Sequence, residues 1–384
     1  MSKLKLMTIL GTRPEIIRLS AVMRCADKYF DQIIVHTGQN YDAELNEIFF
    51  RDLQLRKPDY YLNAAGADLG ETMGKIIAES YKALQKEKPD AVLILGDTNS
   101  ALSAIPAKRL KIPIFHMEAG NRCWDWNVSE MINRKIVDHI SDINLPYTEH
   151  SRRYLLAEGI DGKTIFVTGS PMREVLHHAM PSIEASDVLN RLSLTAGQYI
   201  LVSAHREENI DIENNFISLM TAINRMAERY RVPVVYSTHP RSMKFIKQRN
   251  FKFHPLVRNV KPLGFFDYNH LQMHSLVVLS DSGTLSEESA MLDFCGVLIR
   301  TSTERPEVLD KGTVIIGGIT AGSVSQAAEL AIAMHKAREA RAMPADYADL
   351  NVSVKVVKLI QSYTPIVNET VWLKRSRSYA ETDS

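Results

Sequence analysis

The segment Leu4-Lys-Leu-Met-Thr-Ile-Leu10, followed directly by Gly11-Thr-Arg-Pro-Glu15, shows how this chain is built. Its first seven residues are mostly apolar and have the length of a buried strand. Gly11 permits a tight turn, and proline is favoured in the first turn of a helix because its missing N–H costs nothing there. The segment therefore predicts a buried strand, a sharp turn and a helix, in that order.

The same succession of apolar run, polar turn and amphipathic stretch recurs along most of the chain. The runs that predict buried strands are 4–10, 32–36, 91–95, 112–117, 199–203, 232–238, 275–280 and 296–300. Between them, the predicted helices include 72–85, 101–110, 214–230 and 285–294. Buried strands that alternate with helices are typical of a parallel sheet covered on both faces, so the predicted fold class is α/β.

The series of strands and helices has two halves. They meet near Val167-Thr-Gly-Ser-Pro-Met172, where Gly, Ser and Pro together are typical of a hinge. We expect two doubly wound Rossmann-like domains, over residues 1–170 and 171–365, and a tail over 366–384. In such sheets ligands bind beyond the carboxyl ends of the strands, so the residues that follow each strand are the candidates for a functional site.

Composition and charge narrow the classes of function. Of the 384 residues, 46 are Lys or Arg and 45 are Asp or Glu, so the formal net charge of +1 gives no reason to expect a nucleic-acid or membrane partner. Apolar residues make up 45% of the chain, which excludes a disordered protein. The three cysteines include no C-x-x-C pair, and no apolar run is long enough to span a membrane. We expect a soluble, cytoplasmic protein.

Three acidic residues of the first half lie at or near predicted strand ends. Asp97 and Glu118 each follow a predicted strand, and Glu130 comes soon after. Carboxylates that converge on one crevice suit proton transfer at a sugar or metal binding. Any one of them is equally well explained as a helix cap or a turn residue. Arg13, at a predicted helix N-terminus, either belongs to an anion-binding turn or is a solvated side chain.

Polar residues also follow the predicted strands of the second half. His205 and Arg206 suit diphosphate binding or acid catalysis, with a purely structural role as the alternative, and His239 takes the same place after the next strand. The hydroxyl- and Gly-containing turn 282–284 opens a helix and can hold a phosphate. Glu288, one turn later, can bind both hydroxyls of a ribose.

Seven short motifs stand at these strand ends in a fixed order. They are Gly11-Thr-Arg-Pro-Glu15, Gly96-Asp-Thr98, His116-x-Glu-Ala-Gly120, Asn133-Arg134, His205-Arg-x-Glu-Asn209, Asp281-Ser-Gly283 and Thr303-Glu-Arg-Pro-Glu307. Taken together, they resemble the non-hydrolysing UDP-N-acetylglucosamine 2-epimerase family. The resemblance covers about residues 3–360, and the set of motifs in this order is highly specific.

The resemblance implies a GT-B arrangement, in which UDP lies in the cleft between two Rossmann-like domains and the last helix crosses back to the first. It implies an isomerase that inverts C2 of a UDP-N-acetylhexosamine by anti elimination of UDP to a 2-acetamidoglycal and re-addition. We expect neither a cofactor nor a metal.

The family roles carry over to matching positions. The catalytic residues implied are Asp97, Glu118, Glu130 and His205. The expected contacts to sugar, diphosphate or nucleotide, including those suggested by the turns above, are Arg13, Arg18, Arg134, Arg206, His239, Tyr268, Ser282, Gly283, Thr284 and Glu288. Gln39 matches a position that some members use for an allosteric UDP-sugar.

Three segments are similar to the branch of the family that converts UDP-2-acetamido-2,6-dideoxy-L-talose to UDP-N-acetyl-L-fucosamine for capsule and O-antigen synthesis. They are His36-Thr-Gly-Gln-Asn-Tyr-Asp42, Gly120-Asn-Arg-Cys123 and Asn133-Arg-Lys-Ile-Val-Asp-His139. We therefore expect this reaction, in a homodimer. Interconversion of UDP-GlcNAc and UDP-ManNAc is the alternative.

At one place the chain departs from the family, which usually has Pro-Glu-Glu where this chain has Ser129-Glu130-Met131. The first acid is kept as Glu130, whereas the proline and the second acid are lost. A UDP-sugar sensor without turnover is consequently one open alternative. A GT-B glycosyltransferase and a hydrolysing epimerase that releases UDP are the others.

Overall fold

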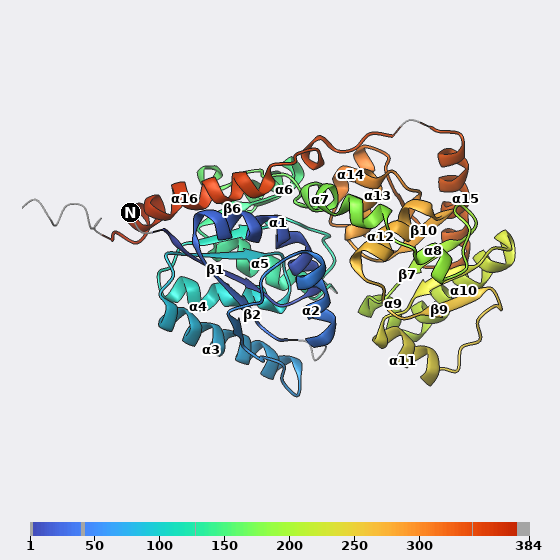
Figure 1. Cartoon of the computed structure of the whole chain (residues 1–384), viewed down its shortest axis with the longest axis horizontal. Helices are drawn as coiled ribbons and strands as arrows, with labels where there is room; N and C mark the ends of the chain where they lie inside the picture. The colour runs from blue at the N-terminus through green and yellow to red at the C-terminus, as the bar shows by residue number, and fades with distance from the viewer. Residues whose placement is uncertain (1–2, 40–42, 127, 340, 375–384) are drawn as a thin grey trace, which may run out of the picture. The chain divides into compact units, whose positions relative to one another are not determined.

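The computed structural model describes residues 3–39, 43–126, 128–339 and 341–374, and the chain forms two compact units. Unit 1 comprises Met1–Val175 and Asp349–Ser384, and unit 2 comprises Leu176–Ala348. Each unit holds one six-stranded parallel sheet with helices packed on it (Figure 1). No helix in the described ranges has the length and apolar character needed to cross a membrane.

The sheet of unit 1 has the strand order β3-β2-β1-β4-β5-β6. Its strands are β1 (Lys5–Leu10), β2 (Asp31–His36), β3 (Tyr60–Tyr61), β4 (Ala91–Leu95), β5 (Ile114–Met117) and β6 (Ile143–Leu145). The helices that begin in this unit are α1 (Arg13–Tyr29), α2 (Ala43–Asp52), α3 (Leu69–Glu87), α4 (Ala104–Arg109), α5 (Glu130–Ile140), α6 (Glu149–Ala157), α7 (Met172–Glu184) and α16 (Val352–Thr370), with short 3₁₀ turns at Asn99–Ser103 and Gly162–Thr164.

Strand β1 is buried because both faces of this sheet are covered. Met7 and Ile9 point to the face where α3, α4 and α5 supply small and apolar side chains such as Leu84 and Val137. In Figure 1, α1 and α16 lie on the other side of the strands. Pro14 lies in the first turn of α1, as expected, and Thr12 is the N-cap of this helix.

The sheet of unit 2 repeats the topology, with the order β12-β11-β10-β7-β8-β9. Its strands are β7 (Ile200–Ser203), β8 (Val234–Ser237), β9 (Val257–Val260), β10 (Val277–Ser280), β11 (Gly296–Leu298) and β12 (Ile315–Ile316). Its helices are α8 (Val188–Arg191), α9 (Glu207–Ile210), α10 (Glu213–Tyr230), α11 (Pro240–Gln248), α12 (Phe265–His274), α13 (Thr284–Leu292), α14 (Pro306–Asp310) and α15 (Ala321–Lys336), with a 3₁₀ turn at Ala345–Tyr347.

Alternate residues of β7 enter two separate cores, as the two-residue period of a strand requires. Ile200 and Val202 pack against the apolar faces of α10 and α15. Tyr199 and Leu201 pack against α8, α12 and α13 on the opposite face. The predicted pair of doubly wound Rossmann-like domains is confirmed, because each sheet is parallel, is covered on both faces and reverses its order next to its first strand.

The end of the chain differs from the expected division. We expect a second domain over 171–365 whose last helix crosses back to the first domain. In the structure α16 packs against α1, and its residues are grouped with unit 1. Its first turn is anchored there, because the Ser353 backbone N–H donates to Glu174 (2.9 Å) and Lys355 donates to the Thr168 carbonyl (3.0 Å). The helix continues to Thr370, which lies inside the expected tail, and residues 375–384 lie outside the described part of the chain.

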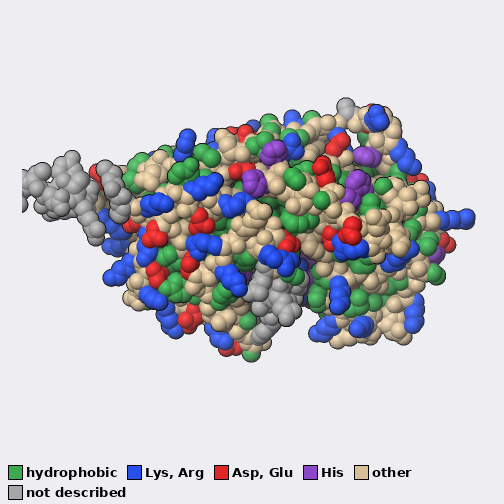
Figure 2. Space-filling model, viewed as in Figure 1, with side chains coloured by type: hydrophobic (Ala, Val, Ile, Leu, Met, Phe, Trp, Pro, Cys, Tyr) green, Lys and Arg blue, Asp and Glu red, His purple; other side chains and the backbone are tan. Residues whose placement is uncertain are grey.

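On the face that Figure 2 shows, Lys and Arg side chains are interspersed with Asp and Glu. This mixture agrees with the formal net charge of +1.

Candidate functional site

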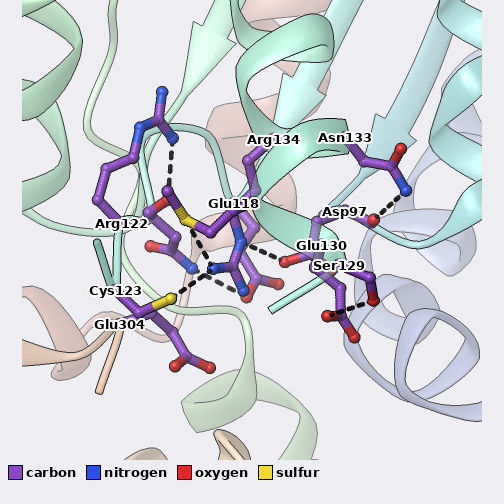
Figure 3. A network of polar contacts seen from close by, with 12 residues as sticks. Asp97, Glu118, Arg122, Cys123, Ser129, Glu130, Asn133, Arg134 and Glu304 are labelled. Atoms are coloured by element: carbon purple, nitrogen blue, oxygen red, sulfur yellow. Dashed lines mark hydrogen bonds and ion pairs between the residues drawn. The ribbon is translucent and has the colours of Figure 1, made fainter. Parts of the chain in front are cut away.

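In unit 1, residues from β4, β5 and α5 come together at the carboxyl edge of the sheet (Figure 3). Asp97 follows β4, and its side chain accepts a hydrogen bond from Arg134 Nε at 2.6 Å. Its carbonyl accepts another from Asn133 Nδ2 at 2.9 Å. Both donors lie one turn after Glu130, the first residue of α5. The start of α5 is thereby fixed against the loop that carries Asp97.

Glu118 lies directly after β5 and is only 6% exposed. Its carboxylate forms an ion pair with the buried Arg18 of α1 and accepts a hydrogen bond from Asn121 Nδ2 at 3.0 Å. Its backbone is left-handed, with φ of 62°, so the chain turns sharply at this residue. A Cβ at Gly96, the residue before Asp97, would lie 3.6 Å from Glu118 Oε2, so the two acid-bearing loops are in close contact.

Glu130 and its neighbours show what the departure from the family pattern does to the structure. Figure 3 shows the Glu130 carboxylate turned toward Ser129, whose hydroxyl donates to it at 3.2 Å. Met131 is fully buried and forms a small apolar cluster with Cys123 and Val128. Its sulfur lies 3.5 Å from the Arg134 guanidinium. The lost acid is thus replaced by an apolar contact that packs against Arg134.

A buried charge network lies behind the Glu118 loop. Asp138 of α5 pairs with His116 Nδ1 at 2.9 Å and with Arg122 at 2.8 Å, and it accepts the Gly120 N–H at 3.1 Å. Arg122 also binds both carboxylate oxygens of Glu158, at 2.9 and 2.6 Å. Because Asp138 contacts a strand residue, a loop residue and a backbone amide, the network fixes the path of the chain on either side of Glu118.

The protonation of this network follows from its contacts. Burial alone would lower the pKa of His116, but the hydrogen bond and charge of Asp138 outweigh burial and raise it. Burial would likewise raise the pKa of Asp138, whereas His116 and Arg122 together lower it. The pair therefore favours imidazolium and carboxylate.

Glu15 of α1 is a buried carboxyl group that joins two loops at the same edge of the sheet. It accepts hydrogen bonds from the Gly11 N–H (3.1 Å) and the Thr12 hydroxyl (2.7 Å) on its own loop, and from Thr98 (3.2 Å) and Ser100 on the loop after β4. Burial raises the pKa of Glu15 to about 7, against the lowering effect of these donors.

The remaining predicted residues of this unit are Arg13, the first residue of α1, and Gln39, which follows β2. The Arg13 guanidinium stacks over the Phe49 ring, with its carbon 5.9 Å from the ring centre. Gln39 Nε2 lies 3.4 Å from the Thr98 hydroxyl, so the position predicted as allosteric lies beside the loop of Asp97. Residues 40–42 of the segment that begins at His36 lie outside the described residues.

In unit 2, Asp281 organises the turn that carries His205 and Arg206. This acid follows β10, is fully buried and accepts the backbone N–H groups of both residues at 2.9 Å. Asn209 Nδ2 donates to the same oxygen at 3.2 Å. The His205 ring lies 5.5 Å from the ring of His239, so the two predicted histidines are neighbours.

The predicted phosphate turn lies beside Arg206. The Ser282 and Thr284 hydroxyls are hydrogen-bonded to each other at 2.9 Å at the start of α13. A Cβ at Gly283 would come within 2.5 Å of Glu304 Oε1, so a larger residue there would have to displace the Glu304 carboxylate. Glu304 in turn pairs with Arg206 at 3.4 Å.

Tyr268 and Glu288 are also neighbours in unit 2. Glu288 is nearly buried and accepts a hydrogen bond from Gln272 Nε2 at 2.7 Å. Burial raises the pKa of the Tyr268 phenol, and the Glu288 charge adds to this effect. The two side chains predicted to face the nucleoside therefore lie within electrostatic reach of each other.

The structure thus brings the predicted residues together in two groups, one at the switch point of each sheet. Four buried acids that organise these groups have no role predicted from the sequence, although three of them belong to the seven motifs and the fourth to a branch segment. These acids are Glu15, Asp138, Asp281 and Glu304. Among the residues that the structure describes, no cluster of three or more His, Cys, Asp and Glu side chains is arranged to hold a metal ion.

Known proteins resemble this chain over nearly its full length. The family model for UDP-N-acetylglucosamine 2-epimerase matches residues 24–361. A solved UDP-N-acetylglucosamine 2-epimerase from Rickettsia bellii is 44% identical, with a TM-score of 0.89 over 97% of this chain and 100% of that one. The Methanocaldococcus jannaschii UDP-GlcNAc 2-epimerase, solved with UDP-GlcNAc and UDP, is 33% identical, with a TM-score of 0.87 over 94% and 100% of the two chains.

A relative with a different sugar substrate matches as well. The UDP-2,3-diacetamido-2,3-dideoxy-D-glucuronate 2-epimerase of Pseudomonas aeruginosa is 32% identical over 86% of this chain and 92% of its own. The chain is accordingly an isomerase and belongs to the UDP-N-acetylglucosamine 2-epimerase family.

Proposed function

We propose that this protein inverts C2 of a UDP-N-acetylhexosamine by anti elimination of UDP and re-addition to a 2-acetamidoglycal. The observation that carries the proposal is the grouping of Asp97 and Glu118 with the start of α5, where Glu130 lies. A glycosyltransferase needs a single base, whereas removal and return of a proton on opposite faces of C2 need more than one acid–base group.

The chemistry explains why UDP has to leave. The C2 proton has no neighbouring carbonyl and is too weakly acidic for a carboxylate to remove directly. When the C1–O bond to UDP breaks, positive charge at C1 acidifies the C2 proton, and a carboxylate can take it. Protonation on the other face and return of the diphosphate oxygen to C1 complete the inversion, so no redox group is consumed.

We assign proton transfer at C2 to Asp97, Glu118 and Glu130. Arg134 forms an ion pair with Asp97 and Arg18 forms one with Glu118, so a guanidinium holds each of these two carboxylates in place. In unit 2, the turn that holds Arg206 and His205 suits the leaving diphosphate, because it offers a guanidinium, an imidazole and the adjacent hydroxyl turn at the start of α13. Stabilisation of the departing charge is where we expect most of the rate enhancement.

The substrate we propose is UDP-2-acetamido-2,6-dideoxy-L-talose, which gives UDP-N-acetyl-L-fucosamine for capsule or O-antigen synthesis, and the support is the similarity of the segments Gly120–Cys123 and Asn133–His139 to that branch. UDP-GlcNAc is the second candidate, because related enzymes are solved with it. We also propose, from the family resemblance, that the protein is a cytoplasmic homodimer.

Incubation with single UDP-sugars in D₂O tests the reaction. We expect product inverted at C2 and carrying deuterium there, because the proton exchanges with solvent between elimination and re-addition. NMR of the product, over a panel that includes both candidate sugars, identifies the substrate. Inverted product that retains its original C2 proton would contradict elimination and re-addition.

The same incubation separates the alternatives, because no acceptor is supplied. A glycosyltransferase would leave the UDP-sugar unchanged, and a hydrolysing epimerase would accumulate free UDP and sugar. A sensor would show thermal stabilisation by the UDP-sugar without turnover. Each of these results would replace the proposed function.

A further inference from the structure

We propose that Asp281 is a positioning residue for His205, holding a proton on the Nδ1 atom of the imidazole so that Nε2 is the atom presented to the ligand. The inference deepens the proposed function and rests on it for the role of His205 at the diphosphate.

The two oxygens of Asp281 have different surroundings. Oδ2 accepts hydrogen bonds from the backbone N–H groups of His205 and Arg206 and from Asn209. Oδ1 is buried and makes no hydrogen bond within the described part of the chain, and His205 Nδ1 lies 3.5 Å from it. A buried carboxylate oxygen without a donor is costly, so the nearby ring nitrogen is favoured to carry a proton and donate it.

This contact determines which nitrogen of the His205 ring can exchange protons with a ligand. The bonds to Oδ2 fix the backbone of the turn, so a small rotation of the His205 side chain is enough to reach the usual range of about 2.7–3.2 Å for such a bond. The side chain is 43% exposed, so the other edge of the ring is accessible to a ligand. A buried carboxylate that holds the proton on one ring nitrogen leaves the other free to give and take protons.

The surroundings of the ring agree with this assignment. His239 lies beside it, and its own Nδ1 accepts the Arg241 N–H at 3.3 Å at the start of α11, so a neutral His239 carries its proton on Nε2. Arg206, the next residue of the turn, is paired with Glu304. Asp281 is thus the carboxylate in contact with the His205 ring.

In the reaction, the His205 imidazolium gives its Nε2 proton to an oxygen of the departing diphosphate and becomes a neutral imidazole that keeps the Nδ1 proton. On re-addition, Nε2 takes the proton back from the diphosphate as the C1–O bond forms. Protons and charge balance over the cycle without a co-reactant.

The tautomer can be measured directly by ¹H–¹⁵N NMR of the histidine rings. In wild-type protein at about pH 8, the signals absent from a His205→Gln variant should show a protonated Nδ1. Asp281→Asn can keep one oxygen for the two backbone amides but turns an NH₂ toward the ring, so the proton should move to Nε2. A protonated Nε2 on His205 in the wild type would overturn the proposal even if Asp281→Asn does not fold.

Kinetics give the second readout. Asp281→Asn should lower kcat by about 10²-fold, with a smaller change in KM, because the ring then presents the wrong tautomer. In a His205→Gln background the same substitution should have little further effect. Losses that multiply in the double variant would show that Asp281 acts by another route and would refute the proposal.

Asn209→Ala is the matched control, because it removes a hydrogen bond to the same carboxylate without touching the ring. It should lower Tm but leave the His205 tautomer unchanged. An inactive wild type would count against the proposed function. The tautomer measurement needs no turnover, so it would still test the role of Asp281.

Discussion

Glu118→Gln should lower kcat by roughly 10²–10⁴-fold, because a carboxamide cannot take up or return the C2 proton. The amide keeps the shape of the side chain and can still accept a hydrogen bond from Arg18 through its oxygen. Its NH₂ group would face Asn121, whose own amide can flip, since its present partner is the Ser151 hydroxyl, which can either donate or accept. The substitution therefore removes the charge and the proton acceptor with little change in packing.

Asp97→Asn should have an effect of the same order for the same reason. This substitution should also change the packing little, because Arg134 can donate to the remaining oxygen of the amide. Steady-state kinetics with the substrate found in the panel give kcat and KM separately. A loss confined to KM would make either acid a binding residue and would leave the proton transfer to the others.

Asp142→Asn controls for the loss of a buried, paired carboxylate. Asp142 is 7% exposed, pairs with Lys108 at 2.6 Å and accepts the Ile114 N–H at the amino end of β5, away from the acid-bearing loops. This variant should lower Tm while kcat stays near the wild-type value. If it lost as much activity as Glu118→Gln, general destabilisation would explain the losses, and the assignment of the acids would fail.

The strands that sequence patterns found are the four central strands of each sheet. All eight predicted runs correspond to β1, β2, β4, β5, β7, β8, β10 and β11. The four missed strands, β3, β6, β9 and β12, are the sheet edges, with two to four residues each. A central strand is buried on both faces and becomes an apolar run, whereas β9, with two exposed residues, has no such run. Edge strands therefore cannot be predicted from apolar runs alone and require knowledge of the tertiary structure.

The helix predicted over 101–110 shows another limit of sequence patterns. The structure divides it into a 3₁₀ turn, Asn99–Ser103, and the short helix α4. Thr98 caps the turn through its side chain, and its hydroxyl also donates to Glu15. That contact joins residues 83 positions apart, so local sequence could not indicate it.

The acids that we propose act on the substrate and the acids that hold the surrounding loops differ in how far sequence predicts them. Asp97 and Glu118 follow from the rule that ligands bind at the carboxyl ends of parallel strands. Asp281 occupies the same place after β10 but points into the protein, where it binds backbone amides. Sequence position cannot separate these two orientations, because both require a polar residue after a strand. Their hydrogen-bond partners separate them, because Asp281 accepts backbone amides whereas Asp97 and Glu118 pair with arginine side chains.

Asp138→Ala should lower the free energy of unfolding of unit 1 by about 3–5 kcal/mol, because it removes the shared partner of two buried cationic side chains. Arg122 would keep Glu158, but His116 and the Gly120 N–H would lose their acceptor. All three tryptophans of the chain, Trp124, Trp126 and Trp372, lie in unit 1, so urea unfolding followed by tryptophan fluorescence reports this unit.

The size of this loss should depend on pH in a defined way. The lowered pKa of Asp138 contributes stability that is present above 3.8, the ordinary value for Asp, and is lost as the pH falls through the lowered pKa. The raised pKa of His116 contributes stability that is present below 6.5, the ordinary value for His, and is lost as the pH rises through the raised pKa. The difference between wild type and variant should therefore be greatest between these two values.

Unfolding curves at about pH 5.5 and about pH 9 test both parts of this expectation. The difference should be smaller at the higher pH, because His116 is less protonated there and its ion pair with Asp138 is weakened. Glu79→Ala serves as control, because it removes a carboxylate that pairs with Lys82 at the surface of α3, and it should leave both curves nearly unchanged. An equal loss for Asp138→Ala at both pH values would show that the His116 contact adds nothing. The path of the Glu118 loop would then depend on Arg122 and the Gly120 N–H alone.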